Sequence, residues 1–147
     1  MGRAVPRDPV DALVGLERFG IKPGLATINE LTAASGKPQA AYRSITVAGS
    51  NGKGSVVAMI DSALRAAGYR VGRYTSPHLT ALAERFVVDG NQISERELRI
   101  EAEQLHHQVN RLVSDGRLSE PPTFFEATTA MALSWFRQAG VELALLE

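Results

Sequence analysis

The sequence of 147 residues contains no cysteine, which excludes disulfide bonds, thiolate zinc sites and a cysteine nucleophile. Sixteen Lys and Arg residues balance sixteen Asp and Glu residues, so the net charge favours neither nucleic acid nor an anionic membrane as a partner. No apolar run approaches the length of a membrane span, and the amino-terminal MGRAVPRDP is too polar for a signal peptide. We therefore expect a cytoplasmic protein without nucleic-acid or membrane partners.

Apolar periodicity predicts a β-loop-α-β unit inside one globular domain. The run YRSITVA is typical of a buried strand and leads into a glycine-rich loop. Residues 53–67 carry the pattern of a largely buried helix, and YRVGRYTS is typical of a second strand. A helix of this length suits a crossover between parallel strands. We therefore expect an α/β fold with a P-loop-type parallel sheet and flanking helices.

Further elements are expected on both sides of this unit. Apolar spacing predicts helices over VDALVGLERF, 29–35, 95–114 and 123–139. ERFVVDGNQIS is typical of a β-hairpin that turns at Asp89-Gly90. VELALLE is typical of a third buried strand and reaches the last residue. Because ligands of open parallel sheets bind beyond the carboxyl ends of the strands, we expect the chain to be a fragment of a longer protein.

A glycine-rich loop between the first strand and its helix is the strongest functional signal. Its residues are Gly49, Ser50, Asn51, Gly52, Lys53, Gly54 and Ser55. Backbone N–H groups and the positive end of the helix converge there, which favours polyphosphate. Lys53 can neutralise phosphate charge, and Ser55 is placed to bind magnesium. A purely structural glycine turn with an exposed lysine is the alternative.

The loop departs from the Walker pattern G-x-x-x-x-G-K-[ST]. Val47 holds the position of the first glycine, and Gly54 holds the hydroxyl position. A kinase or GTPase-like switch is therefore disfavoured, because it would show regular spacing and a strand that ends in a metal-binding aspartate.

The spacing G-x-N-G-K-G-S resembles the nucleotide loop of the Mur ligase superfamily, and within it the folylpolyglutamate synthase and dihydrofolate synthase branch. The stretches AAGYRVGRYTSPHL, ERFVVDGNQIS, TFFEATTAMALSWF and VELALLE follow in the order that this family shows. The resemblance covers most of the chain from Leu16 to Glu147. It implies an incomplete ATP-binding domain, with 1–42 as a helical lead-in, 43–147 as the P-loop core and no carboxy-terminal domain.

The activity implied by this resemblance is the ATP-dependent joining of L-glutamate to dihydropteroate or a folate. ATP would phosphorylate a carboxylate of the acceptor, and the amino group of glutamate would attack the acyl phosphate. We expect the isolated chain to be inactive and the full-length protein to be a monomer. Three questions stay open: which acceptor is used, whether a Mur-type ligase for a cell-wall precursor fits better, and whether the chain is a non-catalytic nucleotide-binding module.

The resemblance also implies roles for individual residues. Lys53 would hold the phosphates as the catalytic residue, with residues 49–52 as backbone donors. Ser55, Ser76 and Glu126 would bind Mg²⁺, a set of hard oxygen ligands that suits this ion. Thr75 is a less favoured substitute for Ser76. Glu126 also has the spacing of a capping box with Thr123, which is a structural alternative.

The stretch FGIKPGLATI aligns with the family's amino-terminal loop near the pterin ring. Ile21, Lys22 and Pro23 are therefore candidate substrate contacts, although a plain connection between helices is the alternative. Lys22 stands where some bifunctional members have an aspartate, which puts a preference for dihydropteroate in doubt. We expect hydrogen-bonding, packing or solvent-facing roles for the histidines, namely His78, His106 and His107.

Overall fold

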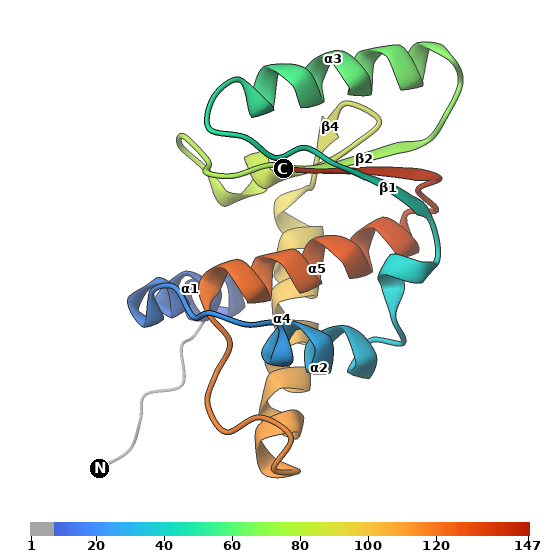
Figure 1. Ribbon diagram of the computed structural model, residues 1–147. Coiled ribbons are helices and arrows are strands. Elements are labelled where there is room, and N and C mark those ends of the chain that lie inside the picture. Colours follow the sequence, from blue (N-terminus) through green and yellow to red (C-terminus); the bar gives the residue numbers. More distant parts are fainter. Residues whose placement is uncertain (1–7) are drawn as a thin grey trace. The chain divides into compact units, whose positions relative to one another are not determined.

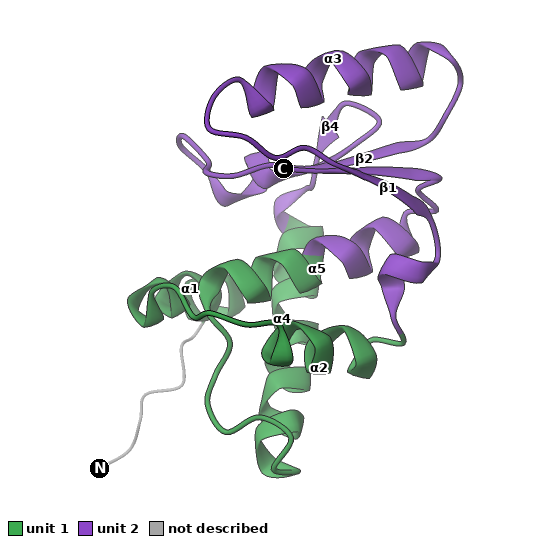
Figure 2. Ribbon diagram, in the orientation of Figure 1, with its two compact units in different colours: residues 1–36, 96–131 green, residues 37–95, 132–147 purple. Residues whose placement is uncertain are grey.

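The structure of the chain, a computed structural model, describes residues 8–147. Residues 1–7 lie outside the described residues. They include most of the stretch that we judged too polar for a signal peptide and the start of the expected helical lead-in. The described part forms two compact units where one was expected (Figure 2). Unit 1 comprises the described residues up to Gly36 together with Arg96–Met131, and unit 2 comprises Lys37–Glu95 and Ala132–Glu147.

Unit 2 is built on a five-stranded sheet with the order β1-β5-β2-β3-β4. The strands are β1 (Arg43–Thr46), β2 (Val71–Tyr74), β3 (Phe86–Val88), β4 (Asn91–Gln92) and β5 (Leu143–Leu146). β5 pairs in parallel with β1 on one side and β2 on the other, whereas β3 and β4 are antiparallel. The predicted α/β fold and the hairpin turn at Asp89-Gly90 are confirmed, and the hairpin belongs to the same sheet.

Helix α3 (Lys53–Ala66) runs over one face of this sheet (Figure 1). Val57 on the helix packs with Val71 and Leu145 of the strands. The prediction that this helix is largely buried is wrong, because only Val57 and Asp61 are buried and Met59 is 65% exposed. A single stripe of the helix faces the sheet, where Ile60 and Leu64 are partly buried beside Val57, whereas Val56 and Met59 remain exposed.

Strand β1 also differs from the prediction. All four of its residues are exposed, although its β-branched sequence predicted a buried strand. The strand lies at the edge of the sheet and pairs only with β5 among the described strands. β2 and β5 have neighbours on both sides and are mostly buried, which confirms the predicted burial of β5.

The part of α5 (Phe124–Gln138) that belongs to unit 2 packs on the face of the sheet opposite α3 (Figure 1). A Cβ on Gly72 would lie 2.7 Å from Cδ1 of Phe136, so only glycine allows this close approach. The ring of Tyr42 lies 6.2 Å from that of Phe136, and its hydroxyl donates to the carbonyl of Leu133 at 2.8 Å. Burial raises the pKa of Tyr42.

Unit 1 is helical. Its elements are α1 (Pro9–Val14), the 3-10 helix η1 (Gly15–Phe19), α2 (Ala26–Ala34), α4 (Glu95–Ser114) from residue 96 onward, and the first part of α5. α4 has the predicted bounds, α2 begins before the predicted residue 29, and the predicted helix over 10–19 divides into α1 and η1. The amide of Gln108 joins α4 to α2 by donating to the carbonyl of Leu31 at 2.9 Å.

Two further 3-10 helices, η2 (Pro38–Ala40) and η3 (Leu82–Arg85), lie in unit 2. Within residues 8–147, none of the helices combines the length and the apolar character that crossing a membrane requires.

Candidate functional site

Three parallel strands of unit 2 end side by side. Leu146 of β5 is the register partner of both Thr46 of β1 and Tyr74 of β2. Three segments leave this edge: the glycine-rich loop of residues 49–55, called the phosphate loop below, follows β1, Thr75-Ser76 follows β2, and Glu147 follows β5. Because ligands of α/β sheets bind beyond the carboxyl ends of the strands, this edge is the candidate site.

The phosphate loop has the local geometry that its sequence predicted. Gly52 is the N-cap of α3 and has a φ of 74°, a left-handed conformation that favours glycine. Residues 48–52 are exposed, and α3 begins at Lys53. The first N–H groups of a helix have no intrahelical acceptor, and Gly52 supplies no side chain to cap them. The loop therefore presents main-chain donors to an anion.

Lys53 folds back over the loop. Its Nζ donates to the carbonyl of Gly49 at 2.9 Å. This bond holds the ammonium group beside the backbone donors, where a phosphate oxygen is a stronger, charged acceptor than a carbonyl. Lys53 is thus placed to exchange a loop contact for a phosphate contact.

An acidic group, Glu147, lies at the same edge. A Cβ on Gly54 would lie 3.7 Å from Oε2 of Glu147, and the Glu147 amide donates to the carbonyl of Tyr74 at 3.0 Å. Glu147 was not among the predicted site residues. A carboxylate directly after a buried central strand was the signal that could have found it. A kinase-like switch was also disfavoured because no strand was expected to end in a metal-binding carboxylate. Because β5 is followed by a carboxylate, only the departure of the loop from Walker spacing still argues against that alternative.

The segment after β2 is held by its own side chains. Glu84 accepts hydrogen bonds from the backbone N–H groups of Leu79, Thr80 and Ala81 at 2.8 to 2.9 Å. These bonds, with one from the Thr80 hydroxyl, favour the charged carboxylate and lower the pKa of Glu84 to about 2. Glu84 therefore stabilises residues 79–81, which follow Ser76 in the same connection.

His78 belongs to the same segment, and its expected hydrogen-bonding role is confirmed. The buried Arg85 donates from Nε to Nδ1 of His78 at 2.9 Å. This bond requires a lone pair on Nδ1, so the neutral ring carries its proton on Nε2.

In unit 1, Glu126 forms the capping box that its spacing allowed. Its Oε2 accepts from the backbone N–H and from the hydroxyl of Thr123, both at 2.9 Å. The Glu126 N–H in turn donates to the Thr123 hydroxyl at 3.2 Å. The structural alternative for Glu126 is therefore confirmed, whereas its metal role stays a prediction. Both bonds to the carboxylate end on Oε2, so Oε1 is the oxygen that can serve a ligand.

Glu126 also lines a cleft of about 580 Å³ in unit 1, a size typical of small-molecule sites. Ile21 and Lys22 line the same cleft, and Nζ of Lys22 lies 3.0 Å from Oε1 of Glu120. Pro23, the third predicted contact, is not among the lining residues. The walls are formed by Gly20, Ile21, Lys22, Gly24, Leu25, Ile28, Thr123, Phe125, Glu126 and Thr129.

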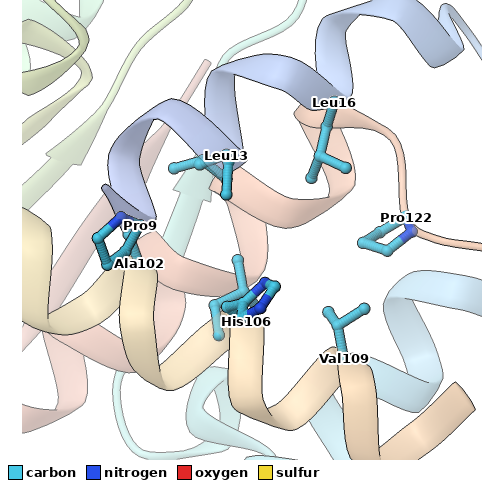
Figure 3. Close-up of a pocket in the computed structure, with 9 residues that line it drawn as sticks. Pro9, Leu13, Leu16, Ala102, His106, Val109 and Pro122 are labelled. Carbon is cyan, nitrogen blue, oxygen red and sulfur yellow. The ribbon is translucent and has the colours of Figure 1, made fainter. Parts of the chain in front are cut away.

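A second cavity of unit 1 has a volume of only about 50 Å³. Figure 3 shows Leu13 and Leu16 facing His106 and Val109 of α4 across it. It is too small for a metabolite. His106 lines this cavity, and His106 and His107 are both exposed, in agreement with the packing or solvent-facing roles expected for them. Across residues 8–147, no three His, Asp or Glu side chains gather as a metal site.

No protein-family model matches the chain. The chain is 42% identical over 140 residues to a probable bifunctional folylpolyglutamate synthase/dihydropteroate synthase of Haloferax volcanii, a match that covers 95% of this chain and 16% of that protein. It is also 42% identical over 124 residues to the dihydrofolate synthase/folylpolyglutamate synthase of Bacillus subtilis, covering 84% of this chain and 28% of that protein. The chain thus spans less than a third of these relatives.

Solved structures agree with these relatives. The Mycobacterium tuberculosis folylpolyglutamate synthase complexed with ADP and AMPPCP matches with a TM-score of 0.82 and 35% identity, over 95% of this chain and 32% of that one. A complex of FPGS, AMPPCP and folate matches with a TM-score of 0.83 and 31% identity, over 95% of this chain and 35% of that one. By sequence and by fold, the chain matches a portion of the members of the folylpolyglutamate synthase/dihydrofolate synthase family.

Proposed function

We propose that this chain carries the ATP-binding part of a ligase that joins L-glutamate to dihydropteroate or a folate through an acyl phosphate. The observation that carries the proposal is the phosphate loop, with its left-handed Gly52 and with Lys53 held over the main-chain donors. Its relatives and the ADP and AMPPCP complexes support ATP as the nucleotide. Transfer of the phosphoryl group depends mainly on positioning and charge neutralisation, which this loop can supply.

In this proposal Lys53 holds the β- and γ-phosphates, and the N–H groups of the loop fix their orientation. Ser55, Ser76 and Glu126 are the proposed ligands of magnesium, as the resemblance implies. We add Glu147, because its carboxylate lies beside Gly54 next to Ser55. Hydroxyl and carboxylate oxygens fit a hard cation. When bound, magnesium would neutralise charge on the transferring phosphoryl group.

The cleft of unit 1 is the proposed site of the acceptor acid. Its walls combine apolar side chains such as Ile28 and Phe125 with a few polar groups, as ligand sites usually do. Ile21 and Lys22 line it, in agreement with their proposed substrate contacts. The complex of FPGS with AMPPCP and folate supports an acceptor of this class.

The test is a titration of the chain with ATP and magnesium, comparing wild type with Lys53→Ala. Charge-assisted hydrogen bonds are worth roughly 1.5 to 3 kcal/mol, so we expect a loss of about 10- to 100-fold in affinity. Lys37→Asn is the matched control, because it also removes a lysine of unit 2. Asparagine tolerates the left-handed backbone at position 37. Equal ATP affinity in Lys53→Ala and wild type would overturn the proposal.

A non-catalytic nucleotide-binding module is the second candidate, because the chain spans a minor part of its relatives. We expect the chain alone to bind ATP without turnover. Phosphate release that requires both glutamate and a folate acceptor would contradict this expectation and favour a self-sufficient ligase. Release that requires a cell-wall precursor instead would favour the Mur-type alternative.

A further inference from the structure

Two neighbouring threonines on α5 differ in how their hydroxyls are satisfied. Thr128 is fully buried, and its Oγ1 donates to the carbonyl of Phe124 at 2.9 Å, one helical turn earlier. Oγ1 of Thr129 is also buried but has no hydrogen-bond partner within the described chain. Buried hydroxyls in native proteins are nearly always bonded. The unbonded Oγ1 of Thr129 therefore requires an explanation.

Thr129 is also a wall residue of the cleft in unit 1. The residue is partly exposed although its Oγ1 is buried, so its exposed surface belongs to its other atoms. In a helix, threonine divides between two χ1 rotamers. A rotation of about 120° about the Cα–Cβ bond moves the hydroxyl to the position of the methyl group or the hydrogen. One such rotation can therefore turn a buried hydroxyl toward a ligand in the cleft.

The other polar side chains of the cleft already have partners, and the atom that they leave for a ligand is Oε1 of Glu126, which as a carboxylate oxygen can only accept. Thr123 and Glu126 bond to each other in the capping box, and Lys22 forms an ion pair with Glu120. The remaining side-chain lining is apolar, with Leu25, Ile28 and Phe125 among it. A ligand with a polar edge would gain most from a group that is still unbonded. A hydroxyl can donate as well as accept, so it can match a ring nitrogen or a carbonyl oxygen.

We propose that Thr129 is a specificity-determining residue of this cleft, whose hydroxyl rotates to hydrogen-bond a heteroatom of the acceptor's ring system. The inference rests on the proposed function, since it takes the acceptor to be a folate or dihydropteroate. In the free chain the hydroxyl is an unsatisfied group, and in the complex it is bonded. The same side chain thus disfavours the free state and favours the bound state.

The test compares Thr129→Val with Thr129→Ser in the full chain, with folate as the probe. Valine keeps the branched shape and removes the hydroxyl, whereas serine keeps the hydroxyl. We expect Thr129→Val to lower folate affinity roughly 3- to 10-fold, the range of one neutral hydrogen bond, and Thr129→Ser to stay within about twofold of wild type. Isothermal titration calorimetry gives both affinities.

Thr128→Val is the matched control, because it removes the adjacent, bonded hydroxyl. We expect it to lower the melting temperature of the free chain and to leave folate affinity unchanged. Thr129→Val should instead raise the melting temperature, since it removes an unsatisfied hydroxyl. A purely structural role of Thr129 would not produce this combination of greater stability and weaker binding.

Equal folate affinity in wild type and Thr129→Val overturns the assignment of Thr129 and leaves the proposed function intact. An equal loss in Thr129→Val and Thr129→Ser also overturns it, because shape rather than the hydroxyl would then matter. Absence of folate binding by the wild-type chain contradicts the proposed acceptor, and this inference with it.

Discussion

The phosphate loop of unit 2 is one run of residues, 49–55, whereas the cleft of unit 1 draws its walls from residues 20–28 and 123–129. In the proposed function the loop would bind phosphate through main-chain N–H groups, which need only the correct local conformation. The cleft would bind the acceptor through side chains that approach each other only after the helices have packed. A site of the first kind resists substitution at most positions, while a site of the second kind depends on many contacts.

The loop nevertheless depends on the helix that follows it. Asp61 of α3 is 2% exposed, and its Oδ2 lies 3.2 Å from Nε of Arg65 and 3.7 Å from Nη1 of Arg73 on β2. The pair with Arg65 lies within the phosphate-loop helix, whereas the pair with Arg73 joins this helix to the sheet. The phosphate loop, which depends on neighbouring residues, can therefore be compared with the cleft, which depends on packing, by substitutions at four residues. They are Asp61, the candidate metal ligands Glu147 and Glu126, and Glu84.

The largest effect is expected for Asp61→Ala. Removing one partner of a buried ion pair costs about 3 to 5 kcal/mol, and both arginines here reach solvent, so we expect a loss of about 2 to 4 kcal/mol in the free energy of unfolding. Urea denaturation followed by circular dichroism measures this loss. Ser62→Ala, at the next and exposed position, should change stability by less than about 0.5 kcal/mol. An equally small change in the free energy of unfolding of Asp61→Ala would show that the ion pairs of Asp61 do not stabilise the helix after the loop.

An intermediate effect is expected at the two carboxylates, Glu147 in unit 2 and Glu126 in unit 1. We expect Glu147→Gln to raise the magnesium concentration needed for ATP binding by about tenfold, roughly 1.4 kcal/mol. Glu126→Gln should have a smaller effect, because Oε2 of Glu126 already caps its helix. Titrations of ATP at fixed magnesium concentrations compare the two variants. The reverse order would assign the main metal contact to the cleft of unit 1.

The smallest effect is expected at Glu84, which holds the segment after β2. Its folded pKa of about 2 lies below the ordinary value of 4.5. The stabilisation is therefore fully present above pH 4.5 and is lost as pH falls through about 2. We expect Glu84→Gln at neutral pH to speed amide exchange at Leu79, Thr80 and Ala81. Exchange in α2 of unit 1 should not change, and unchanged exchange at all three amides would contradict the role of Glu84.

Local structure was largely predictable from the sequence. The loop conformation at Gly52, the turn at Asp89-Gly90, the bounds of α4 and the capping box of Glu126 all depend on residues a few positions apart. Glycine supplies positive φ, and apolar spacing of 3.6 residues marks a helix, whatever the rest of the chain does.

Burial was predicted less well. The apolar residues of α3 and β1 indicated buried elements, yet Met59 and Ile45 are exposed. Side-chain type and periodicity do not reveal whether a strand lies at the edge or the centre of a sheet. That position follows from strand order, which long-range pairing decides.

The sequence by itself predicted the conformation of the phosphate loop and indicated the family, because these depend on neighbouring residues. Only the tertiary structure decided that β5 lies between β1 and β2, which brings Glu147 beside Gly54. It also decided that Ile21, Lys22, Glu126 and the unbonded hydroxyl of Thr129 belong to one cleft region of unit 1. The physical reason is that such contacts join residues about a hundred positions apart, and packing, rather than local propensity, selects them.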